Sequence, residues 1–443
     1  MKQLMDTSER LYQEGERALE LHLYAVAVIL YFVSLRTQIA GVTVTIADMI
    51  GLASIGFLLL IILKGRMSME TVKVAGINVI FIGYIALNGI INDAGMKNII
   101  VEVIQWSSIV AFLCVLHFLN LFKSKRFLSL VALYAFYAAV YTAVWHVVVI
   151  GDFQNFKHLH NAKYLFGFST VMLYLFRSQI KNSHILLFIA FVLLILSGER
   201  KAMLGVLLVL FIDHFFVRGE NTKMTHVVMS LAAAFGVISV WAGIYYFGTD
   251  WIAESLFLTQ NDIYNADLHE ARWDSELWRR LLLANGFSLF MDHFYFGVGP
   301  KMLLSYIAPY FVGNEELIVY THNMLLDIAV EYGIIGVALL FGGVLVRLAK
   351  AFKTRRQNSI PFLLCIYTLS TALFAATQST VILMFMLPFF IDVRLPRGQA
   401  KSAKIKHNEL GCDETSITRH GFLYLDTTGC NKKPRNRGAS CFS

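Results

Sequence analysis

Long apolar runs separated by short polar stretches dominate this 443-residue sequence. A helix of about 20 apolar residues crosses the ~30 Å hydrocarbon core of a bilayer. The apolar runs, several of them shorter than this, lie near 22–37, 44–63, 74–92, 98–122, 127–150, 163–177, 185–197, 202–217, 225–247, 324–349, 359–377 and 379–393. The pattern therefore predicts an all-α integral membrane protein with about 12 transmembrane helices.

Polar segments divide the chain into a cytoplasmic N-terminal segment at 1–21, a polytopic membrane domain at 22–393 and a tail at 394–443. One long connection at 248–321 interrupts the membrane domain, and a loop of this length is usually folded or functional. Within it, residues 266–292 have the apolar spacing of an amphipathic helix. The tail is polar and without periodicity, so we expect it to be disordered.

The composition agrees with a membrane protein, because 57% of the residues are hydrophobic and only 15% are charged. A soluble domain of this length needs a more polar surface. The five cysteines have no spacing typical of a disulfide framework or a zinc site. The first 20 residues are too polar for a cleavable signal peptide.

Basic residues are concentrated in every second short connection, as at 64–66, 123–126 and 350–356. The positive-inside rule places these connections, and both termini, in the cytoplasm. The net charge of +8 is then largely explained, so no nucleic-acid partner is needed. The opposite face carries the connection at 248–321.

Several cations are predicted to meet on that opposite face. Arg200 begins an apolar helix, and an arginine beside free backbone N–H groups suits a phosphate. An interfacial cation that reaches toward the headgroups is the open alternative. In the long connection, Arg272 and Arg279 lie within about 20° of each other around a helix. Arg280 is displaced from Arg272 by about 80°.

His322 begins a second apolar helix, and its ordinary pKa of about 6.5 suits a general base at neutral pH. A purely structural hydrogen-bonding histidine is the alternative interpretation. Neither Asp327 nor Glu331 can orient His322 through its own helix, because Glu331 lies about 180° round and about 13 Å deeper. A structural pair between Glu331 and an arginine of another helix is also open.

Three motifs then resemble one family. His322 and Gly333 match the H-x10-G motif of bacterial O-antigen ligases, and RKAML, from Arg200 to Leu204, matches their R-x3-L motif. The stretch LWRRLLLANGFSLFMDHFYFGVGPKML at 277–303 resembles the loop that precedes the histidine motif. The region at about 185–346 therefore resembles the O-antigen ligase and polysaccharide polymerase superfamily.

Two departures from the family pattern affect the interpretation. Phe294 stands where the family usually has a proline before G-V-G. The loop arginine usually lies a few residues before the tryptophan, whereas Arg272 is six before Trp278. The assignment among Arg272, Arg279 and Arg280 stays open.

The resemblance implies a GT-C-type membrane glycosyltransferase that acts on the periplasmic face of the inner membrane. It would transfer a glycan with inversion from undecaprenyl pyrophosphate to a hydroxyl, without a metal, nucleotide sugar or other cofactor. Arg200 and the loop arginines would bind pyrophosphate, and His322 would be the base. Leu204, Glu331 and Gly333 would support them.

Two acceptors fit this reaction, lipid A-core for a ligase and another lipid-linked repeat unit for a polymerase. The sequence agrees physically with a donor that arrives activated, because that face has no ATP. The sequence expected on the periplasmic face also contains no Asp-x-Asp pair to hold Mg²⁺, so arginine would neutralise the leaving pyrophosphate. The alternative function is a polysaccharide or lipid-linked oligosaccharide transporter or flippase, which predicts ionisable residues at mid-membrane and broken helices in paired halves.

Overall fold

The computed structural model describes residues 2–33, 36–39, 42–151, 163–217, 275–306, 321–355, 358–373, 375 and 379–391. Its N-terminal half contains α1 (Lys2–Val33), β1 (Arg36–Ile39), β2 (Val42–Thr45), α2 (Ile46–Leu63), α3 (Met69–Ile91), α4 (Met96–Phe118), η1 (Leu121–Lys123), α5 (Lys125–Ile150), α6 (Lys163–Leu175) and α7 (Ser183–Leu196). It continues with α8 (Arg200–Ile212), η3 (Asp213–Val217), α13 (Ser275–Asp292), η4 (Leu303–Tyr306), α14 (Met324–Thr354), α15 (Ser359–Ala372) and α16 (Ser379–Phe390).

The described residues form a helical membrane protein. By length and composition, α2, α3, α4, α5 and α14 could each cross a bilayer. Shorter apolar helices cover 18–33 at the end of α1 and also α6, α7, α15 and α16. These elements coincide with predicted apolar runs, whereas the run at 225–247 lies outside the described residues. The predicted total of about 12 crossings stays a prediction.

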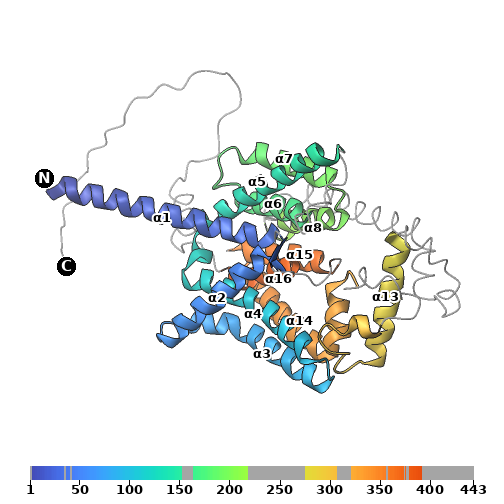
Figure 1. The fold of residues 1–443 in the computed structure, drawn as a ribbon. Coiled ribbons are helices and arrows are strands. Elements are labelled where there is room, and N and C mark those ends of the chain that lie inside the picture. Colours follow the sequence, from blue (N-terminus) through green and yellow to red (C-terminus); the bar gives the residue numbers. More distant parts are fainter. Residues whose placement is uncertain are drawn as a thin grey trace, which may run out of the picture. The chain divides into compact units, whose positions relative to one another are not determined.

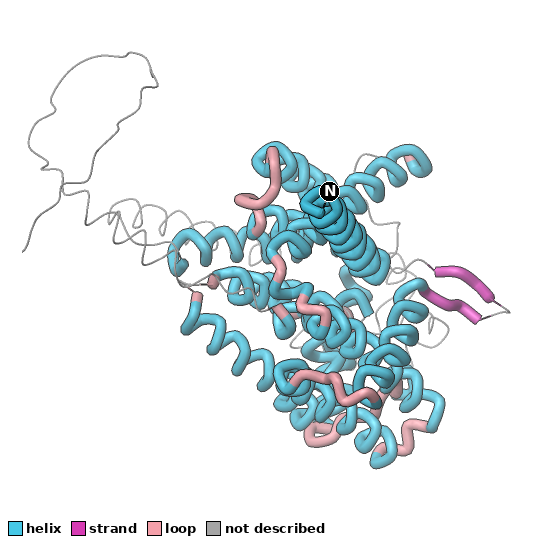
Figure 2. The backbone as a smooth tube through the Cα atoms, turned by 90° about the vertical axis from the view of Figure 1, so that its left-hand side faces the viewer, coloured by secondary structure: helices cyan, strands magenta, loops and turns pink. Residues whose placement is uncertain are grey.

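One antiparallel hairpin departs from the all-α prediction. The strands β1 and β2 pair Arg36 with Thr45, and Figure 2 shows them in magenta beside the helices. The helix predicted at 22–37 is therefore shorter in the structure, where α1 ends at Val33. The hairpin itself is favoured by the sequence VTVT of β2, whose β-branched side chains prefer an extended chain.

Local sequence determines where several helices begin. Thr45 and Asp48 form a reciprocal capping box at the start of α2. Ser68 caps α3, Ser124 caps α5 and Asn323 caps α14, each by accepting a backbone N–H bond. These caps satisfy backbone donors that have no partner within the helix.

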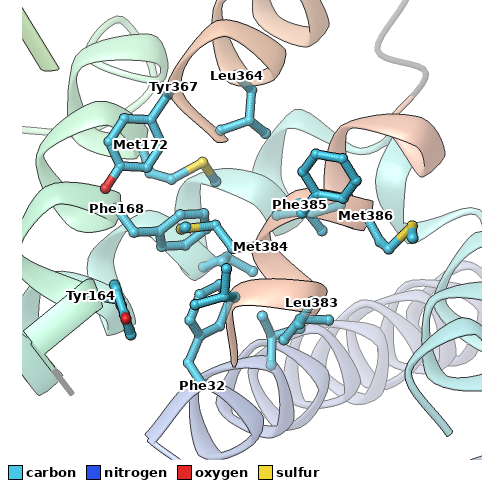
Figure 3. Packing of buried hydrophobic residues seen from close by; sticks show 14 of the residues in the cluster. Phe32, Tyr164, Phe168, Met172, Leu364, Tyr367, Leu383, Met384, Phe385 and Met386 are labelled. Carbon is cyan, nitrogen blue, oxygen red and sulfur yellow. The ribbon is translucent and has the colours of Figure 1, made fainter. Parts of the chain in front are cut away.

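The centre of the bundle is occupied by α16, which is buried from Thr380 to Phe390. Figure 3 shows Met384 and Phe385 packed among residues of other helices, including Phe32 of α1 and Phe168 of α6. An apolar helix without a polar face belongs in such a position. In contrast, α2 leaves many apolar side chains exposed, as a lipid-facing helix does.

Four helices position the candidate site. α14 packs against α3, α4 packs against α3, and α13 packs against α14. Figure 1 shows α3 and α4 beside α14, with α13 on its other side. The sequence predicted one amphipathic helix at 266–292. The structure begins α13 at Ser275, and residues 266–274 lie outside the described part.

Candidate active site

The helix α14 is broken at Gly333, whose backbone has φ 63° and ψ −168°. The break leaves backbone groups without their usual helical partners, and the segment 294–299 supplies new ones. The N–H groups of Val298 and Gly299 donate to the carbonyls of Val330 and Glu331 at 2.8 and 2.9 Å. The backbone just before the break is therefore held by another segment.

The same segment also serves the helix after the break. The N–H of Ile334 donates to the Phe294 carbonyl at 2.8 Å, and that of Ile335 donates to the Tyr295 carbonyl at 3.5 Å. Irregular backbone at membrane depth is tolerated where protein buries it and satisfies its polar groups. We call this mutual pairing of 294–299 with 330–335 the backbone interlock.

The interlock explains the glycines of both motifs. A Cβ on Gly333 would overlap the Tyr295 carbonyl, and a Cβ on Gly297 would overlap the Val330 carbonyl. Both glycines also have positive φ values, 63° and 70°, which disfavour other residues. The H-x10-G glycine and the first glycine of G-V-G thus allow two backbones to touch.

Two polar side chains of α3 complete the interlock. The Tyr84 hydroxyl donates to the Tyr332 carbonyl at 2.9 Å. The Asn88 side-chain amide donates to the Phe296 carbonyl. Sequence reasoning missed both residues, although an asparagine inside an apolar run is a signal of buried polar structure.

A charged cluster lies beside the interlock. The Lys301 ammonium is 2.9 Å from Glu102 Oε2, and the Glu102 side chain is only 1% exposed. The Lys301 backbone N–H donates to Glu331 Oε1 at 3.2 Å. Among the described residues, Lys301 is the cation of this cluster, and the alternative of a pair between Glu331 and an arginine stays a prediction. Glu102 and Lys301 were missed by the sequence analysis.

His322 lies just before α14, with an exposed side chain and a left-handed backbone at φ 62°. Its neighbour Thr321 donates to Asp327 Oδ1 through its N–H at 2.7 Å and its hydroxyl at 2.6 Å. The sequence excluded Asp327 as an orienting residue through its own helix. The structure shows that Asp327 instead fixes the backbone next to His322.

The helix α13 packs against the residues at the start of α14. A Cβ on Gly286 would lie 2.7 Å from the Thr321 methyl group and 3.1 Å from a Leu326 methyl group. Gly286 therefore allows α13 to approach the start of α14. Thr321, the residue before His322, is thus held by its hydrogen bonds to Asp327 and by the packing of α13.

The predicted phosphate-binding residues are described only in part. Arg200 is the first residue of α8, and its backbone is described but its side chain is not. The same holds for Arg279 and Arg280 in α13, and Arg272 lies outside the described residues. The proposed ligand contacts of these four arginines therefore stay predictions.

The start of α8 has further features. Its N-cap residue, Glu199, makes no side-chain cap bond to the helix. The Lys201 ammonium lies 5.5 Å from the ring centre of Tyr164, a cation–π distance. Leu204, one turn into α8, is half-buried. Among the described residues, no group of three or more His, Cys, Asp and Glu side chains is arranged to hold a metal ion.

Comparison with known proteins shows which family these elements resemble. Residues 185–341 match the O-antigen ligase family. This segment, about a third of the chain, is therefore similar to the O-antigen ligase domain. The matched region runs from α7 into α14, so it includes the start of α8, α13, the interlock and His322.

A curated relative points to the same kind of process. This chain is similar over part of its length to the teichuronic acid biosynthesis protein TuaE of Bacillus subtilis (strain 168). The two are 26% identical over 162 residues, which cover 35% of this chain and 32% of the relative. The match thus spans about a third of the relative's length. Together the comparisons support a role in membrane polysaccharide biosynthesis.

Proposed function

We propose that this protein is a membrane glycosyltransferase of the ligase or polymerase type. It transfers a glycan from undecaprenyl pyrophosphate to a hydroxyl of lipid A-core or of another lipid-linked repeat unit. The reaction takes place at the periplasmic face of the inner membrane, with both chain termini in the cytoplasm. The observation that carries the proposal is the interlock, which joins the G-V-G segment to the helix that follows His322 inside the region similar to the O-antigen ligase domain.

In the proposed reaction, His322 accepts the proton of the acceptor hydroxyl as its oxygen bonds to the anomeric carbon. The bond from that carbon to the pyrophosphate oxygen breaks on the opposite face, so the configuration inverts. Arg200 and one or more of Arg272, Arg279 and Arg280 neutralise the leaving undecaprenyl pyrophosphate. Arginine suits this role because its planar fork binds phosphate oxygens in pairs. No metal is required by this scheme.

The broken helix also bears on the transporter alternative. In transporters, carbonyls freed by a helix break bind ions or substrates. Here the carbonyls of Val330 and Glu331 accept N–H groups of Val298 and Gly299, and the Tyr332 carbonyl accepts the Tyr84 hydroxyl. These groups are therefore occupied by protein, which favours a supported catalytic helix over an ion site.

The test uses the purified protein in liposomes with a lipid-linked glycan donor and each acceptor in turn. We expect His322→Ala to reduce transfer by about 10²-fold or more, the usual range for a general base. Binding of the donor should persist, measured with a labelled lipid-linked glycan. Formation of capped lipid A-core identifies a ligase, and elongation of the lipid-linked unit identifies a polymerase.

The matched control is His184→Ala, because His184 is an exposed histidine of α7 far from the H-x10-G motif in sequence. It should transfer as the wild type does. Normal transfer by His322→Ala would remove the proposed base. A wild-type protein that moves lipid-linked glycan across the bilayer without forming a new glycosidic bond would favour the transporter.

A further inference from the structure

Lys301 joins three parts of the molecule. Its ammonium pairs with Glu102 Oε2 at 2.9 Å and donates to Gln105 Oε1 at 3.4 Å, both on α4. Its backbone N–H donates to Glu331 Oε1 on α14 at 3.2 Å. Lys301 itself follows the G-V-G segment that forms the interlock. One residue therefore connects α4, the interlock and the broken helix.

The backbone of Lys301 indicates that this position is held firmly. Its φ of 59° lies in the left-handed region, where a residue with a side chain is uncommon. Such a conformation persists only where the surrounding contacts determine it. The contacts of Lys301 with Glu102, Gln105 and Glu331 are of that kind.

Glu102 is already engaged on its other oxygen. Trp106 Nε1 donates to Glu102 Oε1 at 2.8 Å, and the Tyr332 hydroxyl donates to the same oxygen at 3.1 Å. Trp106 and Tyr332 are both fully buried. The second oxygen faces Lys301, close enough for an ion pair although not aligned as a hydrogen bond. A buried carboxylate without its cation is costly.

The cluster of Lys301, Glu102 and Glu331 lies at one end of a short helical segment, and His322 lies just before the other end of that segment. The first part of α14, from Met324 to Tyr332, lies between His322 and the break at Gly333. It is about 12 Å long at ~1.5 Å per residue, so a tilt of about 10° displaces its far end by about 2 Å. A misplacement of about 1 Å can reduce a rate by about 10²-fold.

We propose that Lys301 is a positioning residue, whose ion pair with Glu102 sets the orientation of the helical segment that carries His322. The inference rests on the proposed function, because the positioned group is the proposed base. Lys301 contacts Glu102 and Glu331 rather than substrate in this scheme, so it acts on the chemical step and not on donor affinity.

The first experiment compares Lys301→Met with wild type in the liposome assay. We expect kcat to fall by about 10-fold or more, while KM for the lipid-linked donor changes by less than about twofold, as for a loss confined to the transition state. Lys123→Met is the matched control, since Lys123 also pairs with a glutamate, Glu70, at 3.0 Å. It should leave kcat and KM unchanged.

The double variant Glu102→Gln/Lys301→Met separates positioning from folding. A glutamine oxygen can still accept from Trp106 and Tyr332, and no charge at position 102 is left unpaired. We expect this variant to transfer faster than Lys301→Met alone. Wild-type kcat in Lys301→Met would overturn the proposal. So would a double variant that transfers no faster than Lys301→Met, or a parallel loss of donor binding and transfer.

A second readout does not depend on transfer. Diethyl pyrocarbonate modifies accessible histidines. Mass spectrometry then gives the rate of modification of His322 relative to that of the exposed His184. Lys301→Met should change this ratio by about twofold or more, because the His322 helix is displaced by ångströms. An unchanged ratio overturns the positioning role. A wild type without transfer overturns the proposed function, while a changed ratio in Lys301→Met still supports the coupling of Lys301 to His322.

Discussion

Two lysine–glutamate pairs in this protein have nearly the same length but different surroundings. Lys123 and Glu70 are 3.0 Å apart with side chains 40% and 65% exposed, whereas Lys301 and Glu102 are 2.9 Å apart with side chains 20% and 1% exposed. Water screens the first pair and can replace either partner. Water cannot replace Lys301 at the buried Glu102 carboxylate. Burial rather than distance therefore determines how much each pair contributes to stability.

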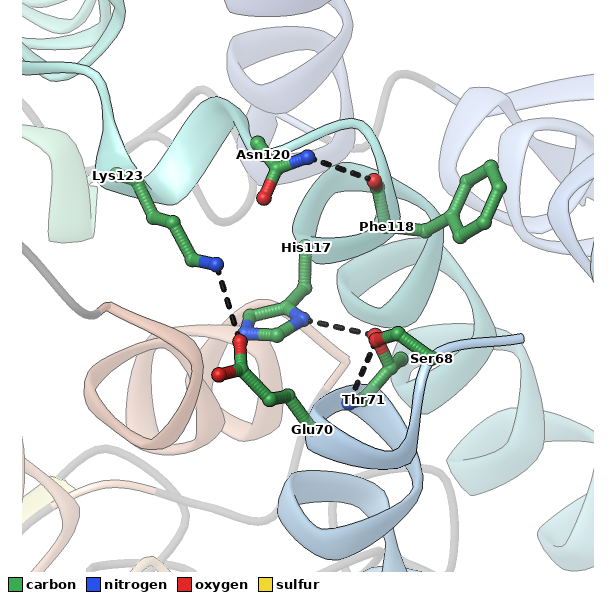
Figure 4. Close-up of polar contacts among 7 residues, drawn as sticks. All are labelled: Ser68, Glu70, Thr71, His117, Phe118, Asn120 and Lys123. Carbon is green, nitrogen blue, oxygen red and sulfur yellow. Dashed lines mark hydrogen bonds and ion pairs between the residues drawn. The ribbon is translucent and has the colours of Figure 1, made fainter. Parts of the chain in front are cut away.

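The two pairs also differ in what else holds their surroundings. Figure 4 shows Lys123 and Glu70 beside a second link, in which the Thr71 hydroxyl and His117 Nδ1 lie 3.0 Å apart. Ser68 also caps the start of α3 there. The start of α3 is thus tied to α4 without the ion pair. Among the described residues, Lys301 is the cation at the junction of α4, the interlock and α14.

The largest effect is expected from breaking the interlock that the buried pair supports. Gly333→Ala places a methyl group against the Tyr295 carbonyl in a left-handed backbone. We expect a loss of about 3 kcal/mol or more in the free energy of unfolding, the upper range for one strained residue with an added overlap. Denaturant unfolding in detergent measures this change, and glycan transfer should be lost with it.

Gly342→Ala is the control in the same helix, because its new methyl group would meet nothing within 4 Å. Its free energy of unfolding should stay within about 1 kcal/mol of the wild type. Equal effects at Gly333 and Gly342 would show that the break in α14 is not held by the interlock.

The parts of this site that sequence can predict are those encoded within short segments. The H-x10-G spacing and the G-V-G segment identified the family, and the domain match confirmed that resemblance. Their physical meaning depends on a backbone contact between 294–299 and 330–335, which no local pattern contains. Asp327 was judged only by its angle from His322, and the structure shows that it acts through Thr321.

Contacts between distant parts of the chain explain the other differences. The pairing of Glu102 with Lys301 joins α4 to a loop nearly two hundred residues away. Helical periodicity therefore cannot predict this pair. A structural pair between Glu331 and an arginine was left open as one alternative, because a buried carboxylate needs a partner from another helix. The hairpin was missed because an apolar run of Val and Thr also fits the start of a membrane helix.

An intermediate effect is expected at the buried ion pair. Lys301→Met leaves Glu102 buried without this lysine, but the cost stays below the ~3–5 kcal/mol of a fully buried pair because the Lys301 side chain is 20% exposed. The free energy of unfolding in detergent should fall by about 2 kcal/mol, between the values for an exposed and a fully buried pair. The Glu102→Gln/Lys301→Met variant should regain part of it, because the unpaired charge at position 102 is gone. A double variant less stable than Lys301→Met would show that shape rather than charge governs this cluster.

The smallest effect is expected at the exposed pair. Lys123→Met should change the free energy of unfolding by no more than about 1 kcal/mol, because exposed pairs gain little and are screened by salt. Raising the ionic strength should reduce even that difference, since the Debye length shrinks to about 3 Å at 1 M salt. The measurement is the same unfolding curve at low and high salt. A Lys123→Met variant as unstable as Lys301→Met would contradict the comparison, because two pairs of equal length would then contribute equally despite their different burial.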